Sequence, residues 1–245
     1  MLTIQDLSYQ YRDHQVLANV SMHLDQGETV AILGPSGVGK TTLFNLIAGI
    51  LPIQTGQILL DGSSDIKGKV SYMLQKDMLY PHYTVMENIM LPRIIQGEKR
   101  LQAEQYAREL LEIFEMDKWA PYYPHTLSGG MRQRVAFMRT AAFGRAYLLL
   151  DEAFSALDAI TRRSLHEWFM AYRQQMNWSS LLITHDVDEA LILANRIYVL
   201  RGQPGRLVRV FEREFAVKQI DKDIFLPEFL KAKKALLEDL SSPEI

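Results

Sequence analysis

Hydrophobic residues form short runs along this chain, and stretches with apolar residues three or four positions apart lie between them. The runs have the length and the bounding glycine or polar residues of buried strands, and they cover 28–34, 57–62, 69–75, 146–151 and 179–184. Helical spacing occupies 39–49, 99–116, 131–142, 159–176 and 187–194. Strands that alternate with helices predict an α/β fold with a largely parallel central sheet.

The two ends of the chain depart from this alternation. Residues 1–8 and 20–24 alternate or cluster apolar residues as strands do, which predicts a small antiparallel β layer joined to the main sheet. The segment from residue 197 to about 210 predicts a hairpin, and residues 227–240 predict a short helix. A length of 245 residues is enough for one large domain with a proper core, or for two small ones.

Composition narrows the functional classes. Hydrophobic content is 48% and charged content is 23%, which is ordinary for a soluble globular protein. Lys and Arg number 27 against 29 Asp and Glu, so the net charge of −2 lacks the electrostatic footprint of bulk nucleic-acid binding. The absence of cysteine excludes disulfides and thiolate metal sites. There is no signal-peptide pattern and no apolar run near the roughly 20 residues of a spanning helix, so we expect a protein that is soluble on its own.

The segment GPSGVGKT, residues 34–41, carries the clearest chemical signal. It fits the pattern G-x-x-x-x-G-K-[ST], with a predicted strand before it and a predicted helix after it. Glycines let backbone N–H groups wrap phosphates, and the helix N-terminus adds partial positive charge. Lys40 can reach the β and γ phosphates, and the Thr41 hydroxyl can ligate Mg²⁺. A glycine turn before a core helix is the simpler alternative, but the strand, helix, lysine and threonine together favour a nucleoside-triphosphate site.

The segment AYLLLDE, residues 146–152, supplies the acidic groups that such a site needs. Its apolar strand places Asp151 at the C-terminal end, where open α/β sheets bind their ligands. A carboxylate there can hold Mg²⁺, and Glu152 can polarise a water for attack on the γ phosphate. An Asp-Glu pair on its own often only begins a turn, so the assignment depends on GPSGVGKT being present as well.

A second pair of glycines follows a serine in LSGGMRQR, residues 127–134, at a predicted helix start that suits an anion. With it, the motif order is that of a known family: GPSGVGKT, Gln75 after a strand, LSGGMRQR, LLLDE, SALD (155–158) and THD around His185. Over residues 1 to about 210 the chain resembles the ATP-binding-cassette (ABC) ATPases, for which LSGG is highly specific. The resemblance implies a P-loop NTPase cassette with a mostly parallel central sheet, a small antiparallel β layer and a helical subdomain. It implies a single domain over 1–245, with the helical subdomain at about 76–145 and a short C-terminal hairpin and helix at about 197–245.

The resemblance also implies why one chain carries two phosphate cradles. In the family two cassettes pack head to tail, and each ATP lies between the P-loop of one chain and the LSGG segment of the other. Ser128, Gly129 and Gly130 are then expected to contact the partner chain's ATP, and Asp158 to lie in the D-loop at the dimer contact. A second cassette, in the simplest case an identical one, is therefore an expected partner.

Other roles follow from the resemblance position by position. Tyr11 stands where the family stacks an aromatic ring on adenine, although a surface tyrosine beside a strand is the plainer alternative. Gln75 and His185 resemble the residues that contact the attacking water and the γ phosphate, so with Glu152 they form the expected catalytic set. Thr41, Gln75 and Asp151 are the expected Mg²⁺ ligands. The expected ATP-binding residues are Tyr11, Gly34, Pro35, Ser36, Gly37, Val38, Gly39, Lys40, Thr41 and Thr42.

Several residues depart from the family pattern or lack a chemical pattern of their own. Ala153 and Arg145 stand where the family commonly has proline, which weakens the placement in a subfamily and leaves the ATPase assignment intact. The five histidines at 14, 23, 82, 125 and 166 show no ligand spacing, so we expect surface or helix-face positions for them. Arg132, Arg134 and Arg139 are better explained as one polar helix face than as a nucleic-acid patch.

The nearest resemblance within the family is to import ATPases of the nitrate, sulfonate and taurine group. It implies a peripheral subunit on the cytoplasmic face of the membrane that energises import of a small solute. Its expected partners are an integral-membrane permease and, indirectly, an extracytoplasmic solute-binding protein, with no nucleic acid. The apolar segment between Gln75 and residue 99 predicts loop and short helix, with regular structure broken at Pro81 and Pro92. The resemblance implies that this segment contacts the permease, and packing against the cassette's own body is the plainer alternative. A soluble ABC ATPase for regulation, DNA repair or translation, without a permease, is the alternative.

Overall fold

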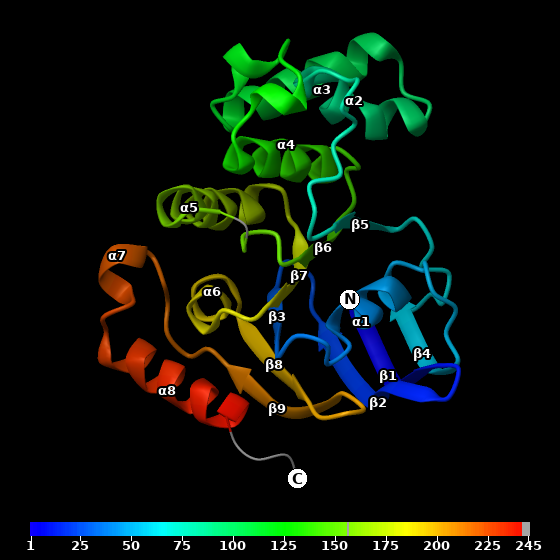
Figure 1. The fold of residues 1–245 in the computed structure, drawn as a ribbon, viewed down its shortest axis with the longest axis vertical. Coiled ribbons are helices and arrows are strands. Elements are labelled where there is room, and N and C mark those ends of the chain that lie inside the picture. The colour runs from blue at the N-terminus through cyan, green and yellow to red at the C-terminus, as the bar shows by residue number, and fades with distance from the viewer. Residues whose placement is uncertain (156, 242–245) are drawn as a thin grey trace.

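A computed structural model describes residues 1–155 and 157–241 of the chain, so Ala156 in SALD and the last four residues of the expected C-terminal segment lie outside the described residues. Two sheets organise the fold (Figure 1). The larger has the strand order β5-β6-β7-β3-β8-β9. Its strands are β5 (Val70–Met73), β6 (Tyr147–Asp151), β7 (Ser179–Thr184), β3 (Thr29–Leu33), β8 (Arg196–Arg201) and β9 (Arg206–Glu212). Neighbouring strands are parallel except at the edge, where β9 runs antiparallel to β8. The predicted α/β class and the parallel sheet are confirmed.

The smaller sheet is antiparallel and has the order β2-β1-β4. It consists of β1 (Leu2–Tyr11), β2 (His14–Leu24) and β4 (Thr55–Leu60). The two N-terminal strands are longer than the predicted 1–8 and 20–24, and they form one hairpin. Register shifts near Asp6 and Asn19, which both have positive φ, break the two-residue period by which the sequence identifies a strand.

The central strands are covered on both faces, which is why their sequences are apolar without alternation. Alternate side chains of β3 belong to two different hydrophobic clusters: Val30 and Ile32 pack with α1 (Lys40–Ile47) and the small sheet, and Ala31 and Leu33 pack on the opposite side. That opposite cluster contains buried residues of α5 (Ala159–Gln175), α6 (Val187–Leu193) and α8 (Pro227–Ser241). Sheet and helices therefore form a layered core that fixes the carboxyl ends of β3, β6 and β7 side by side.

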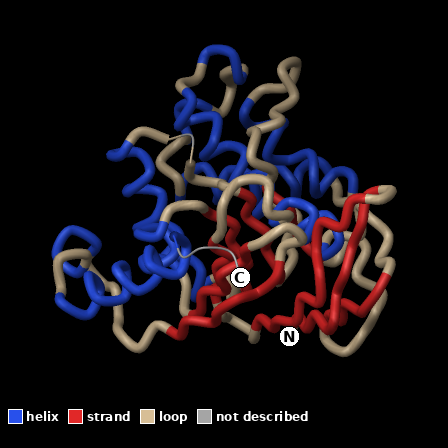
Figure 2. Tube along the Cα trace, turned by 60° about the horizontal axis from the view of Figure 1, so that its bottom comes forward, coloured by secondary structure: helices blue, strands red, loops and turns tan. Residues whose placement is uncertain are grey.

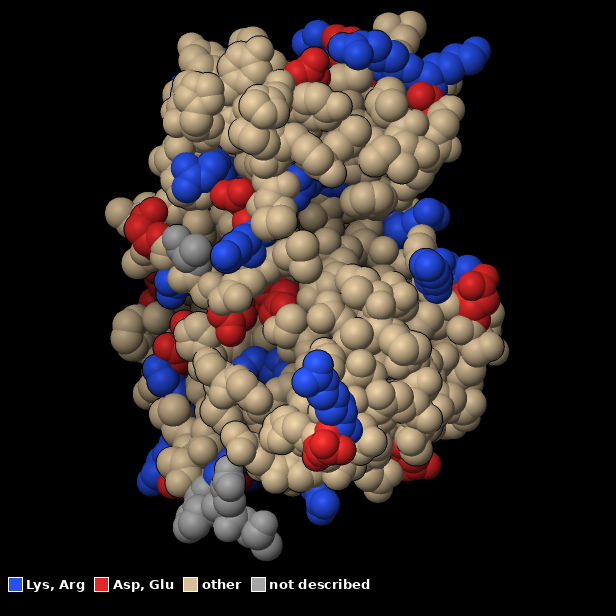
Figure 3. Space-filling view, turned by 45° about the vertical axis from the view of Figure 1, so that its right-hand side comes forward, with Lys and Arg blue, Asp and Glu red and all other residues tan. Residues whose placement is uncertain are grey.

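A helical layer lies beyond the β5 and β6 side of the sheet, at the top of Figure 1. It contains α2 (Val85–Ile95), α3 (Arg100–Ile113) and α4 (Gly129–Ala141), with the short 3-10 helices η1 (Asp117–Trp119) and η2 (Pro124–Thr126). Figure 2 shows the strands gathered together, with most helices above them and to their left in that view. On the face shown in Figure 3, basic and acidic side chains are interspersed. Within the described part of the chain, no helix is long and apolar enough to span a bilayer.

The prediction of a broken segment before residue 99 is wrong for α2, which is a continuous helix of 11 residues with Pro92 inside it. Its start is fixed by a capping box, in which Thr84 Oγ1 accepts from Glu87 N and the Glu87 carboxylate accepts from Thr84 N. Burial of Val85, Ile89 and Met90 holds the helix in the core, so packing outweighs the proline. The sequence analysis also missed the four-residue helix α7 (Ile220–Asp223).

Candidate functional site

The P-loop connects the end of β3 to the start of α1, as the sequence predicts. Gly39 is the N-cap of α1 with φ 105°, and a Cβ there would lie 2.8 Å from Leu17 Cδ2. At Gly34 a Cβ would lie 2.3 Å from the carbonyl oxygen of Leu200. A side chain at Gly34 would collide with the backbone, and one at Gly39 would be strained by the backbone conformation and crowded by Leu17, so both positions favour glycine. A glycine loop that leads into the start of a helix is the arrangement that binds phosphate.

Lys40 is the first residue of α1 and is only 5% exposed. Its Nζ donates to the carbonyl oxygens of Gly34 at 2.7 Å and Pro35 at 2.8 Å, so the ammonium group lies over its own loop. Burial lowers the pKa of Lys40, while the negative charges of Glu152 and Asp151 act in the opposite direction. A buried cation aimed at the loop fits an anionic ligand in the loop.

Asp151 ends β6 and is 4% exposed. The hydroxyl of Tyr72, on the neighbouring β5, donates to Asp151 Oδ2 at 3.2 Å. Burial raises the pKa of Asp151, and hydrogen bonds from the side chains of Thr41 and Tyr72 partly offset that effect. The pKa of Tyr72 is raised as well, first by burial and then by the charge of Asp151. A buried carboxylate beside a threonine hydroxyl is an oxygen donor set that fits Mg²⁺ with most of its ligands supplied by phosphate and water.

The Glu152 carboxylate is contacted by two predicted partners. Gln75 Nε2 donates to Oε2 at 2.9 Å, and His185 Nδ1 lies 3.4 Å from Oε1. Glu152 itself has φ 48°, in the left-handed region, and its N–H donates to Ile183 O at 3.0 Å on the adjacent β7. Backbone strain of this kind persists only where the surroundings hold it, and it is common at functional sites. The ends of three neighbouring strands thus bring Gln75, Glu152 and His185 together.

Gln75 and Glu152 line one pocket of about 300 Å³ together with the P-loop, whereas His185 and Asp151 are not part of its lining. Its lining comprises Val16, Ser36, Gly37, Gly39, Lys40, Thr41, Thr42, Gln75 and Glu152. Of the other residues expected at the nucleotide, Gly34 and Pro35 meet the Lys40 ammonium and Val38 is buried. Tyr11 is 46% exposed at the end of β1, edge-on to Tyr9, and it is not part of the lining.

The signature segment lies at the start of α4. Ser128 is the N-cap, and its Oγ accepts from Met131 N at 3.3 Å, while Gly129 and Gly130 are the first helical residues. None of the three lines the P-loop pocket. The helix is tied to the P-loop side by Arg132, whose Nε donates to Asp77 Oδ2 at 3.0 Å, and by Gln133, whose Nε2 donates to Ala153 O at 2.7 Å.

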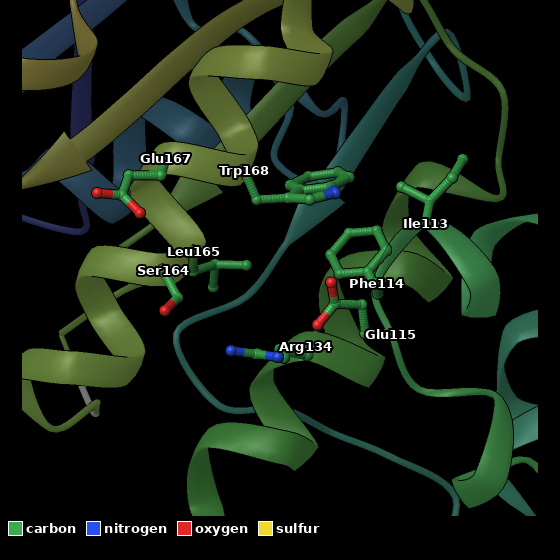
Figure 4. A pocket seen from close by; sticks show the side chains of 8 residues that line it. All are labelled: Ile113, Phe114, Glu115, Arg134, Ser164, Leu165, Glu167 and Trp168. Carbon is green, nitrogen blue, oxygen red and sulfur yellow. The ribbon is translucent and has the colours of Figure 1, made fainter. Parts of the chain in front are cut away.

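A second cavity, of about 260 Å³, lies between the end of α3, α4 and α5 (Figure 4). Arg134 and Glu115 face it from one side and Trp168 from another. It contains no P-loop residue and no residue of the predicted catalytic set, so it is separate from the nucleotide pocket.

Asp158 is at the start of α5, where its Oδ1 accepts from Thr161 N at 3.0 Å, and this contact lowers the pKa of its carboxyl group. His166 is 4% exposed and lies on the face of α5 that packs into the core, so of the two expected positions, surface or helix face, it occupies the second. Its Nε2 lies 3.0 Å from Glu189 Oε1 on α6, and its ring packs edge-on to Phe154. A charged partner allows an imidazole to be buried, and the sequence shows no sign of a pair 23 residues apart.

Sequence reasoning also missed three residues that hold this site. Tyr72 has no motif of its own, and only its place one strand away from Asp151 identifies it. Arg139 was assigned to a polar helix face, but its guanidinium donates to the carbonyl oxygens of Asp77 and Met78 at 2.7 and 2.6 Å. Arg162 lies in the first turn of α5 and contacts the loop after Glu152. Tyr72 and Arg139 share one signal, a polar side chain in an element with many buried residues, whereas most described residues of α5 are exposed or half-buried and Arg162 carries no such signal.

Comparison with known proteins gives consistent results. Residues 17–155 match the ABC transporter family. The formylaminopyrimidine import ATP-binding protein ThiZ of Halalkalibacterium halodurans is 38% identical over 205 residues, which is 83% of this chain and 81% of that protein. The aliphatic sulfonates import ATP-binding protein SsuB of Bacillus cereus is 38% identical over 84% of this chain and 81% of its own length. The solved dimeric ATP-binding cassette MJ0796, in a post-hydrolysis state bound to ADP and Pi, is 27% identical with a TM-score of 0.77, covering 88% of this chain and 100% of that one.

Proposed function

Because the chain belongs to the ABC transporter family and is an ATP-binding, ATP-hydrolysing subunit that energises import, we propose which of its residues do this work and with which partners. One observation carries the proposal: Gln75 and His185 both contact the Glu152 carboxylate beside the Lys40 ammonium and the P-loop. That grouping unites a phosphate cradle with a water-positioning carboxylate, which are the two parts that phosphoryl transfer to water requires.

In the proposed mechanism the P-loop N–H groups and Lys40 bind the phosphates. Glu152 orients the attacking water and accepts its proton, and Gln75 and His185 keep the carboxylate in position. Mg²⁺, held through Thr41, Asp151 and Gln75, would neutralise charge on the phosphate oxygens when bound. Tyr11 would stack on the adenine ring, which suits an exposed aromatic side chain at the end of β1.

The signature residues are proposed to serve the ATP of a second cassette, in the simplest case an identical one. Ser128, Gly129 and Gly130 begin a 13-residue helix, yet they do not line the chain's own nucleotide pocket. An anion-binding helix start without an anion partner in its own chain is what a head-to-tail dimer would use. Asp158 would lie at the same contact.

The permease is proposed to bind at the exposed apolar segment after Gln75. Met78, Tyr80 and Tyr83 are 58%, 51% and 41% exposed, and the two tyrosine rings lie 5.6 Å apart. Aromatic and methionine side chains on a surface favour a protein contact. The subunit would then work on the cytoplasmic face of the membrane, and a solute-binding protein outside would deliver the solute.

The experiment is a pull-down of the tagged cassette from detergent-solubilised membranes, with identification of the recovered proteins and an ATPase assay on the same sample. We expect a permease with several apolar spans and ATP hydrolysis that Lys40→Ala abolishes. Recovery of no membrane protein, with hydrolysis intact, would favour the alternative of a soluble ABC ATPase. Hydrolysis that survives Lys40→Ala would contradict the proposed nucleotide site.

A further inference from the structure

The loop that follows Glu152 is held by one side chain from outside it. Arg162, in the first turn of α5, donates from Nε to Phe154 O at 3.1 Å and from Nη2 to Leu157 O at 2.8 Å. A longer contact joins Nη2 to Ser155 O at 3.4 Å. The guanidinium therefore binds the carbonyl groups of Phe154, Ser155 and Leu157. Without Arg162 these carbonyl groups would have to form hydrogen bonds with water instead.

The same guanidinium faces a second segment of the site. Arg162 Nη1 lies 3.8 Å from Asp186 Oδ2, and Asp186 directly follows His185. The other oxygen, Asp186 Oδ1, caps α6 by accepting from Asp188 N at 2.8 Å and Glu189 N at 3.2 Å. The carboxylate thus uses one oxygen to start α6 and turns the other toward Arg162.

These contacts connect His185 and Glu152, two members of the catalytic set, by two separate routes. His185 Nδ1 lies 3.4 Å from Glu152 Oε1, and the two residues are also linked through Asp186, Arg162 and the loop after Glu152. The loop begins at a strained residue, because Glu152 has φ 48°. Ser155 helps to hold that strain, since its N and Oγ donate to Glu152 O at 3.1 and 2.9 Å.

We propose that Arg162 is a positioning residue for ATP hydrolysis: it fixes the loop after Glu152 and, through Asp186, the segment that carries His185, so that the two side chains keep one relative position. The proposal rests on the roles given to Glu152 and His185 above. Arg162 and Asp186 are 32% and 39% exposed at their side chains, so solvent screens their mutual attraction, and the directional hydrogen bonds to the carbonyls carry most of the effect.

The geometry requires an arginine and not merely a positive charge. A planar guanidinium presents several N–H donors in fixed directions, and here two of its nitrogens donate to Phe154 and Leu157 while the third lies 3.8 Å from Asp186. A lysine ammonium keeps the charge, but it is a single point on a flexible stem. Arg162→Lys therefore removes the planar set of N–H donors and keeps the positive charge.

The test uses the full-length protein in its transport complex, with Arg162→Lys, Asp186→Ser and the double variant. Serine is a good N-cap, so Asp186→Ser retains the start of α6 while it removes the group that faces Arg162. Arg163→Gln is the matched control, because Arg163 is the next residue and its contacts are to Glu167 and Asp221 on the outer surface. The measurements are kcat and KM for ATP, and the thermal midpoint of each variant.

We expect Arg162→Lys to lower kcat by about 10-fold or more, the effect of a small misplacement of reacting groups, with KM changed by less than about threefold. Asp186→Ser should lower kcat by less than Arg162→Lys, because it removes only the screened contact and leaves the hydrogen bonds to the carbonyls in place. The double variant should be no slower than Arg162→Lys, because that substitution already disrupts the contact with Asp186. Arg163→Gln should behave as the native protein.

The proposal is overturned if Arg162→Lys keeps the native kcat, if the two substitutions multiply in the double variant, or if kcat falls only in proportion to a general loss of thermal stability. Failure of the underlying mechanism is seen separately. If Glu152→Gln hydrolyses ATP at the native rate, the proposed function fails. If Glu152→Gln loses hydrolysis but Arg162→Lys keeps the native kcat, only the positioning role of Arg162 is overturned.

Discussion

Replacement of Gly39 by alanine should destabilise the protein and prevent nucleotide binding. The destabilisation has two causes, backbone strain and crowding of the new Cβ, and substitutions at two other glycines separate them. Gly39 has φ 105°, and a left-handed backbone costs an L-residue about 1–2 kcal/mol. Its Cβ would also lie 2.8 Å from Leu17 Cδ2 and 3.0 Å from Val16 Cγ1, and overpacking of this kind costs about 1–3 kcal/mol. The expected loss in the free energy of unfolding is therefore about 2–5 kcal/mol.

Gly37 and Gly62 provide the controls for packing. They have φ 82° and 80°, and a Cβ at either would meet no atom within 4 Å. Alanine there should cost only the backbone strain of about 1–2 kcal/mol. In a chain of this size 1 kcal/mol moves the thermal midpoint by about 2–4 °C, so Gly39→Ala should melt about 4–20 °C below the native protein and the two controls about 2–8 °C below it.

The assay is thermal unfolding with and without ATP. A ligand at 100 times its Kd stabilises by about 2.7 kcal/mol, so ATP should raise the midpoint of the native protein by about 5–11 °C. Gly62 lies in the turn after β4, away from the pocket, so Gly62→Ala should keep the full ATP shift, and Gly39→Ala should show none. Equal midpoints for Gly39→Ala and Gly37→Ala, or an undiminished ATP shift in Gly39→Ala, would refute the reasoning.

Three further substitutions test other parts of the site. Glu152→Gln keeps the shape of the side chain and removes the base, so ATP binding should persist, hydrolysis should fall by about 10²- to 10⁴-fold, and size-exclusion chromatography should show an ATP-bound dimer; near-native turnover would remove Glu152 from its role. Tyr83→Asp should weaken co-purification with the permease at unchanged ATP binding. Val208→Asp is the control that should not, because Val208 is an exposed apolar residue of β9, 55% exposed against 41% for Tyr83. Burial raises the pKa of Asp151, so ionisation of its carboxyl group in the folded protein costs stability above that pKa, and Asp151→Asn should melt higher than the nucleotide-free native protein at neutral pH. The difference should shrink as the pH falls through the raised pKa toward the ordinary pKa of an aspartate, and a difference that stays constant across that range would contradict this cause.

The fold could be predicted where local pattern and burial agree. The central strands are buried on both faces, so a run such as Leu148–Leu150 is apolar throughout and can be recognised from the sequence as a buried strand. The phosphate-binding loop could also be predicted from the sequence, because its tight backbone has positions that favour glycine. Gly34 and Gly39 are such positions, and the residue that follows the second one, Lys40, is placed by the helix start.

Prediction failed where distant residues decide the outcome. Pro92 indicates a broken segment when the sequence is considered locally, but the Thr84–Glu87 capping box and three buried side chains stabilise a continuous helix. His166 has no ligand spacing, yet a carboxylate 23 residues away on another helix holds it in the core. No local pattern contains that pairing, because α5 and α6 are separated along the chain by β7 and come together only through tertiary packing.

The relative placement of the two predicted anion-binding segments, the P-loop and the signature segment, also depends on distant contacts. The motifs identify both segments, and the structure shows that they do not share a pocket: the P-loop pocket contains Gln75 and Glu152 but none of Ser128, Gly129 and Gly130. The signature helix is nevertheless bonded to that pocket's borders, by Arg132 to Asp77 two residues after Gln75, and by Gln133 to Ala153 directly after Glu152. Movement of the signature helix relative to either border would break a buried or half-buried hydrogen bond, and such bonds are costly to leave unmade. The two bonds therefore hold Ser128, Gly129 and Gly130 at a fixed position relative to Gln75 and Glu152, although the two groups of residues belong to different anion-binding segments.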